Sequence, residues 1–280
     1  MANLRLSDSP TRVSGTQVSL GSQFAASCGS DRICVDKTLI CKGFWDVVDD
    51  TSRICLPRRS GKTFNLQLLQ LFFSPLPELD CLGILPDDDD SNSAIALSRA
   101  KRESFFNESL LKKLHPEFFD EHFMKHPVVF ISFESCKRRS SGGLVKRLCK
   151  AIARSVQHHL DELKHSKLTV CPEAIDAEMD LRGFLETVKQ LRGLPNDDFA
   201  QRSELPCDLF SALSRFVRRQ FGGYILLVDE YDIPFLTLLE GNWDEVDRDD
   251  SSTILETLFQ DMFKVCTHQN LYTTGEGLSW

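Results

Sequence analysis

Residues 54–73 read ICLPRRSGKTFNLQLLQLFF and contain the pattern that decides the fold. A short apolar run, Ile54-Cys55-Leu56, precedes a polar loop that ends in Gly61-Lys62-Thr63. From Thr63 onward, apolar residues recur at steps of three and four, which predicts a helix that ends before Pro75. The stretch therefore predicts a buried strand, a loop and a helix in immediate succession.

A loop between a strand and a helix can bind phosphate, because its N–H groups and the positive end of the helix face the anion. Gly61, Lys62 and Thr63 match the second half of the pattern G-x-x-x-x-G-K-[ST], in which the Lys reaches the β- and γ-phosphates and the hydroxyl ligates Mg²⁺. Leu56 occupies the position of the first Gly, so the match is partial. The other loop residues expected to contact the nucleotide are Pro57, Arg58, Arg59 and Ser60.

Residues 224–228, YILLV, form an uninterrupted apolar run that is followed by Asp229-Glu230. At the end of such a strand in an ATPase, one carboxylate holds Mg²⁺ through its water shell and the next polarises the attacking water. Asp229 and Glu230 fit these two roles, and an acidic turn after a core strand is the simpler alternative. Because ligands bind at the carboxyl ends of parallel strands, we expect both motifs to lie at the same edge of one sheet.

The rest of the chain alternates strands with helices. Residues 128–133 are β-branched and aromatic, which predicts a buried strand. Helices are predicted over 144–163 and 209–221, the second closed by Gly222, and a further helix over 254–265. A last strand is expected at 271–273. This alternation predicts an α/β architecture with a mainly parallel sheet.

Residues 1–30 are rich in Ser, Thr, Gly and Asn and are predicted to form a disordered lead-in, with one domain over 31–280. Inserted loops are expected near 84–104, which contains four consecutive Asp residues, and near 166–206, with one helix around 181–191. The Phe-rich stretch from 105 to 123 is interpreted as helical core packing rather than a platform for stacking bases.

The composition excludes several classes of protein. The 280 residues include 33 basic and 41 acidic side chains, so the formal net charge is −8, which argues against binding nucleic acid by bulk charge. No apolar run approaches the roughly 20 residues of a membrane-spanning helix, and no signal peptide is recognisable, so cytoplasm is expected ahead of nucleus. The ten Cys residues are interpreted as reduced thiols, and His158-His159 as a surface pair.

Four segments resemble the AAA-ATPase-like family: VDKTLICKGF from residue 35, the loop segment quoted above, HPVVFISFES from residue 126 and YILLVDEYDIPF from residue 224. The resemblance covers roughly residues 33–275, and its most specific parts are P-R-R-x-G-K-T and D-E-Y-D-x-P. It implies a P-loop NTPase three-layer α/β/α fold that is truncated at the C-terminal end. Many members carry a PD-(D/E)xK nuclease-like domain after this module.

The same resemblance implies ATP and Mg²⁺ as cofactors. Lys62 and Thr63 would contact the phosphates and Mg²⁺, Asp229 would bind the metal, and Glu230 would act on the water, which makes Lys62 and Glu230 the catalytic candidates. Residues 36–38, Asp-Lys-Thr, resemble an upstream D-K-T element that is expected near the nucleotide.

Mg²⁺-dependent ATP hydrolysis is the leading hypothesis. A nucleotide-binding switch or interaction module with weak or no turnover is the second hypothesis, and a small-molecule phosphotransferase is the third. Besides the nucleotide, self-association or a protein partner is considered as a further interaction. No membrane partner is expected, and nucleic acid enters only by analogy with the nuclease-linked relatives.

Overall fold

The computed structural model describes residues 35–46, 61–84, 91–137, 143–191, 204–240 and 245–267. Within these residues helices dominate, and two strands, β1 (Val128–Ser132) and β2 (Ile225–Asp229), form a parallel sheet. The register pairs Val128 with Ile225 and Ser132 with Asp229. The strands predicted at 54–56 and 271–273 lie outside the described residues, so the larger parallel sheet stays a prediction.

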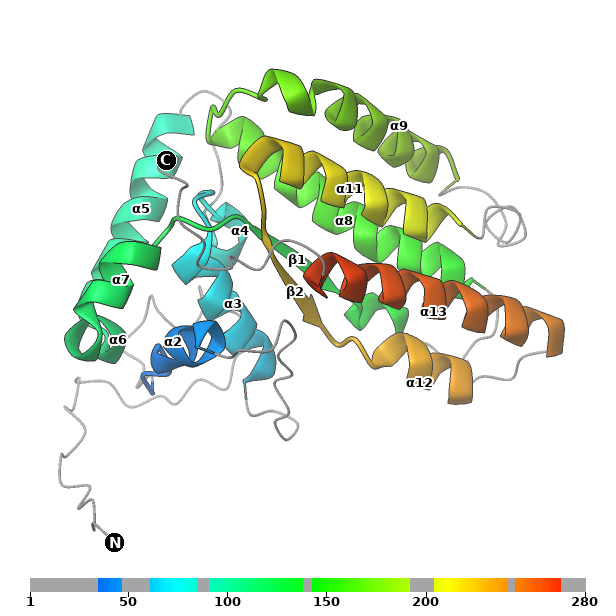
Figure 1. Ribbon diagram of the computed structural model, residues 1–280, viewed down its shortest axis with the longest axis horizontal. Helices are drawn as coiled ribbons and strands as arrows, with labels where there is room; N and C mark the ends of the chain where they lie inside the picture. Colours follow the sequence, from blue (N-terminus) through cyan, green and yellow to red (C-terminus); the bar gives the residue numbers. More distant parts are fainter. Residues whose placement is uncertain are drawn as a thin grey trace, which may run out of the picture.

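Alternate side chains of the two strands enter two separate hydrophobic cores. Val128, Ile225 and Leu227 belong to the first core, whereas Val129 and Ile131 belong to the second. Large apolar side chains fit at every one of these positions because helices cover both faces of the sheet. Figure 1 shows α2 to α7 on one side of the strands and α8, α9, α11 and α13 on the other.

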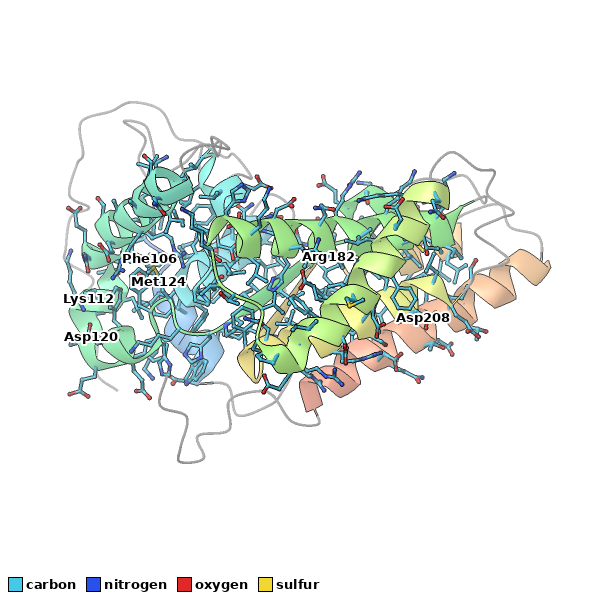
Figure 2. The ribbon with its side chains drawn as sticks, turned by 90° about the horizontal axis from the view of Figure 1, so that it is seen from above. Phe106, Lys112, Asp120, Met124, Arg182 and Asp208 are labelled. Atoms are coloured by element: carbon cyan, nitrogen blue, oxygen red, sulfur yellow. The ribbon has the colours of Figure 1, made fainter. Side chains whose placement is uncertain are left out.

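The helices of the first core precede β1 in the chain. They are α2 (Leu39–Trp45), α3 (Lys62–Phe73), α4 (Leu79–Leu82), α5 (Ser91–Asn107), α6 (Leu110–Leu114) and α7 (Pro116–His122). Phe72, Phe73 and Phe106 are fully buried among them, and Phe118 stacks on Phe72 with ring centroids 5.8 Å apart. Figure 2 shows Phe106 among the side chains that fill this layer. The interpretation of the Phe-rich stretch as core packing is confirmed.

The helices of the second core are α8 (Leu144–His165), α9 (Ile175–Leu191), α11 (Leu205–Phe221), α12 (Ile233–Glu240) and α13 (Glu245–Thr267), with short 3₁₀ turns η1 (Glu134–Cys136) and η2 (Pro172–Ala174). The first three cross from the end of β1 back to the start of β2, as a parallel pair requires. α11 ends as predicted at Gly222, which has φ +81° and donates its N–H to Arg218 O at 2.7 Å. α13 extends beyond the predicted 254–265 at both ends.

α5 fills most of 84–104, which was predicted as an inserted loop. The helix expected around 181–191 in the second insertion is present as α9, which begins earlier, at Ile175. The buried face of α5 is formed by Ala94, Ser98, Arg102 and Phe106, which are spaced four residues apart, and two of the four are polar. The helical period is therefore interrupted in the hydrophobic pattern, and the Ser and Asn content suggested a loop.

The described helices include none that combines the length and apolar character needed to cross a bilayer. The six cysteines within the described residues are free, and Cys41, Cys136 and Cys149 are buried. Burial raises the pKa of the Cys136 and Cys149 thiols to about 12, so both remain protonated at neutral pH.

Candidate functional site

The N-terminus of α3 begins at the sequence Gly61-Lys62-Thr63. Gly61 is the N-cap residue with φ +86° and ψ +33°, and its carbonyl accepts the N–H of Asn65 at 2.9 Å. Glycine adopts this left-handed conformation without the steric cost that a Cβ imposes. Lys62 and Thr63 are half-buried in the first turn. The first N–H groups of a helix have no partner within the helix, so this turn can bind an anion.

The carboxyl end of β2 lies against this turn. Thr63 Oγ1 donates a hydrogen bond to Asp229 Oδ2 at 2.9 Å, across 166 positions of sequence. Asp229 is only 6% exposed, and burial raises its pKa, while hydrogen bonds from the Thr63 hydroxyl and the Glu230 backbone N–H lower it. The structure therefore brings together the two residues that sequence analysis assigned to one Mg²⁺ site.

Glu230 follows directly, in a left-handed conformation with φ +53°. Its side chain is half-buried, and its carbonyl accepts the N–H of Ile233 at 3.1 Å, which starts α12. The conformation turns the chain sharply at the strand end. Tyr231 and Asp232, the next residues of the acidic motif, are exposed.

Glu134 is a further carboxylate at the same edge of the sheet, and sequence reasoning gave it no role. It follows β1, is exposed, and its charge raises the pKa of Asp229. Its position directly after the strand predicted at 128–133 could have identified it, because neighbouring parallel strands end at the same edge of a sheet.

The Asp36-Lys37-Thr38 segment lies beside the α3 N-terminus. A Cβ built on Gly61 would lie 3.3 Å from Lys37 Nζ, so the ammonium group packs against the end of the predicted phosphate loop. Asp36 and Thr38 hydrogen-bond to the N-terminus of α6. The segment therefore lies beside Gly61, and its place near a bound nucleotide stays a prediction.

Pro57, Arg58, Arg59 and Ser60 lie outside the described residues. No cluster of three or more His, Cys, Asp or Glu side chains able to hold a metal occurs in the part of the chain that the structure describes. A Mg²⁺ ion in a phosphate-transfer site takes most of its ligands from water and substrate phosphates, with one or two protein oxygens. The hydroxyl of Thr63 and the carboxylate of Asp229 are hard oxygen donors of this kind.

The prediction of a surface pair at His158-His159 is wrong. His159 is 3% exposed, and His158 lies within 3.3 Å of both Glu78 and Asp80. Burial alone would lower the pKa of His158, but its hydrogen bonds to the two carboxylates outweigh that effect and raise the pKa to about 10. Glu78 is 2% exposed, and a buried carboxylate of this kind cannot be recognised from sequence, because charged residues are mostly exposed.

A polar network surrounds His158 and joins α8 to the segment between α3 and α4. Glu162 accepts the backbone N–H groups of Glu78 and Leu79, each at 2.8 Å, and Gln70 donates to Glu78. Burial, followed by the charge of Glu78, raises the pKa of Glu162 to about 7. The bonds of His158 and Glu162 connect α8 to the segment on the other side of β1, and the Gln70–Glu78 bond holds that segment against α3, so the network has a structural role.

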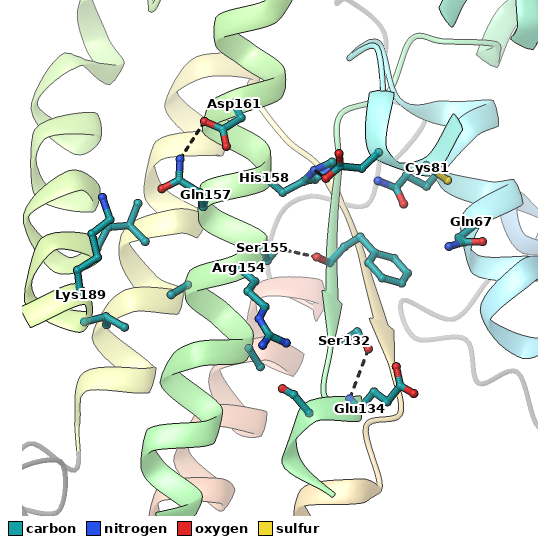
Figure 3. A pocket seen from close by; sticks show the side chains of 18 of the residues that line it. Gln67, Cys81, Ser132, Glu134, Arg154, Ser155, Gln157, His158, Asp161 and Lys189 are labelled. Atoms are coloured by element: carbon teal, nitrogen blue, oxygen red, sulfur yellow. Dashed lines mark hydrogen bonds and ion pairs between the residues drawn. The ribbon is translucent and has the colours of Figure 1, made fainter. Parts of the chain in front are cut away.

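An open cavity of about 820 Å³ extends from this network along the outer edge of β1. Figure 3 shows His158 and Cys81 at one end and Ser132 and Glu134 at the other, with Arg154 on α8 between them. The hydroxyl of Ser155 donates a hydrogen bond to the backbone carbonyl of Phe130 at 2.6 Å, so this carbonyl of β1 has a partner on α8. The cavity thus reaches the carboxyl end of β1, where Ser132 pairs with Asp229.

Comparisons with known protein families, with curated proteins and with solved structures found no match.

Proposed function

We propose that this chain is a P-loop NTPase module that binds Mg²⁺-ATP and hydrolyses it. The observation that carries the proposal is the 2.9 Å hydrogen bond from Thr63 to Asp229. Two motifs that the sequence separates by 166 positions meet at one strand end, beside a helix N-terminus that begins with Gly61 and Lys62. An acidic turn with only a structural role would not require this pairing.

The described residues suggest a division of roles. Lys62 and the first N–H groups of α3 bind the β- and γ-phosphates, and Thr63 and Asp229 hold the hydrated cation. Mg²⁺, when bound, neutralises charge that develops on the phosphates. Glu230 orients and polarises the attacking water from the end of β2. No step requires a cysteine or a histidine.

We also infer that β1 and β2 belong to a larger, mainly parallel sheet in a three-layer fold. The parallel register and the helices on both faces support this inference. The segments 54–56 and 271–273 would supply the further strands, which a chemical-shift assignment of the intact chain can test.

A nucleotide-binding switch with little turnover is the second candidate. Leu56 in place of the first loop Gly favours it, because that Gly normally allows the loop to approach the phosphates closely. The two candidates differ in turnover and share the binding site.

The test measures Mg²⁺-ATP binding by calorimetry and phosphate release by the wild type, Lys62→Ala and Glu230→Gln. We expect Lys62→Ala to weaken ATP binding by about tenfold or more, because a charged hydrogen bond is lost. Glu230→Gln should bind ATP with the affinity of the wild type, and its rate of ATP hydrolysis should be lower by about a hundredfold or more.

Glu240→Gln is the matched control, since Glu240 is exposed at the end of α12 and the substitution is identical. Its binding and turnover should equal those of the wild type. Binding without turnover by the wild type would favour the switch. A folded wild type that binds neither ATP nor GTP would overturn both candidates.

A further inference from the structure

We propose that Lys37 is a second phosphate-binding lysine of this site, contacting the nucleotide beside Lys62. The inference rests on the proposed nucleotide-binding function and adds to it a residue from a segment remote from both motifs. It assigns Asp36 and Thr38 as positioning residues that hold Lys37 in place.

The position of the Lys37 ammonium group is the first step. Its Nζ lies 3.3 Å from the point where a Gly61 Cβ would stand, and the Lys37 side chain is half-buried. Gly61 is the last loop residue before Lys62, and its left-handed conformation directs the chain into α3. A cation at this residue therefore lies beside the N–H groups that would receive the phosphates.

The backbone on either side of Lys37 is fixed by four hydrogen bonds. Asp36 Oδ1 accepts the N–H and the hydroxyl of Thr38 at 2.8 and 2.7 Å, and Asp36 Oδ2 accepts the N–H of Leu110 at 2.7 Å. Thr38 Oγ1 in turn accepts the N–H of Leu111 at 3.1 Å, and Thr38 is fully buried. Both carboxylate oxygens of Asp36 are thus committed to the positioning of this segment.

The charges at the site favour an anion with several negative charges. The Lys37 ammonium group and the positive end of α3 meet at Gly61, and Lys62 is the next residue in the chain. A di- or triphosphate group carries enough negative charge to contact both lysines and the helix end together, and a lysine side chain is a common phosphate ligand.

The test compares Lys37→Met, Lys37→Arg and the control Lys113→Met by calorimetric titration with Mg²⁺-ATP. Lys113 is exposed on α6, the helix to which the Lys37 segment is hydrogen-bonded. We expect Lys37→Met to weaken ATP binding by about tenfold to a hundredfold, and Lys37→Arg to recover most of the loss. Lys113→Met should bind as the wild type does.

The dependence on salt separates a phosphate contact from a merely structural role. A charge contact is screened, so the affinity ratio of wild type to Lys37→Met should narrow as NaCl is raised, whereas a packing defect would keep it constant. Circular dichroism checks that each variant is folded, and Lys37→Gln, which also removes the charge, replaces Lys37→Met in the comparison if that variant does not fold.

The possible failures are distinguishable. If Lys62→Ala loses ATP binding while Lys37→Met binds like the wild type, the role of Lys37 is refuted and the proposed function stands. A ratio that does not change with salt, or no recovery in Lys37→Arg, also refutes it. If the folded wild type binds no nucleotide, the proposed function and this inference fail together.

Discussion

Adding one methyl group at Gly61 tests how the turn before α3 is built. Gly61 has φ +86°, where an L-residue is less stable by about 1–2 kcal/mol. The new Cβ would also lie 3.3 Å from Lys37 Nζ, a contact that the flexible ammonium group relieves by moving a few tenths of an ångström. We therefore expect Gly61→Ala to lower the free energy of unfolding by about 1–2 kcal/mol and to weaken ATP binding.

Two other glycines separate the backbone effect from the contact. Gly222 has φ +81° with nothing within 4 Å of a built Cβ, so Gly222→Ala should show the same loss of stability without a change in ATP affinity. Gly183, within α9, also has nothing within 4 Å and no positive φ, so Gly183→Ala should be more stable by about 0.5–1 kcal/mol.

Urea unfolding of the four proteins measures the stabilities, and calorimetry measures ATP binding. Each kcal/mol corresponds to about 2 °C in Tm for a domain of this size. Gly61→Ala with wild-type stability would refute the argument from backbone strain. Gly61→Ala that loses stability like Gly222→Ala but binds ATP like the wild type would refute the placement of phosphates at Gly61.

Two further predictions concern hydrogen bonds. Thr63→Val removes the donor to Asp229 and should lower stability by about 1–3 kcal/mol in urea unfolding, whereas Thr63→Ser keeps the donor and should lose less; equal losses would contradict this. The pKa of His158 is about 10 in the folded state against 6.5 ordinarily, so its pairing stabilises the fold fully below pH 6.5 and progressively less as the pH rises toward 10. His158→Gln should therefore show a smaller decrease in Tm between pH 7 and 10 than the wild type, and parallel decreases would rule out this role.

The elements predicted correctly are those with apolar side chains at regular spacing. α3, α8 and α11 have apolar faces at three- and four-residue steps, and β1 and β2 are uninterrupted apolar runs. Their ends were also predictable, because Pro75 and Gly222 terminate helices through their own backbone chemistry. The proximity of Thr63 and Asp229 was predictable because parallel strands of one sheet end at the same edge, whatever their sequences.

The missed features depend on polar groups whose burial sequence cannot reveal. Arg102, 2% exposed, donates to the backbone carbonyls of Leu71, Ser74 and Leu76, and this stabilises α5 against the end of α3. Leu71 lies in the last turn of α3 and Ser74 and Leu76 follow that turn, where the helix itself supplies no donor. An arginine in a Ser-rich segment gives no sign of this role, because most arginines are exposed.

The charges at the end of β2 bear on whether Mg²⁺ binds before ATP or together with it. Burial makes the ionised form of Asp229 unfavourable and raises its pKa. This effect is offset only in part by the Thr63 hydroxyl, the Glu230 N–H and the charge of Lys62, because the pKa of Asp229 stays above its ordinary value. A divalent cation would favour ionisation more strongly than any of these groups, because it is the largest local charge. The same lysine and the positive end of α3 repel a free cation until phosphates neutralise them. The site is therefore expected to bind Mg²⁺ and ATP as one complex, with the metal alone binding weakly.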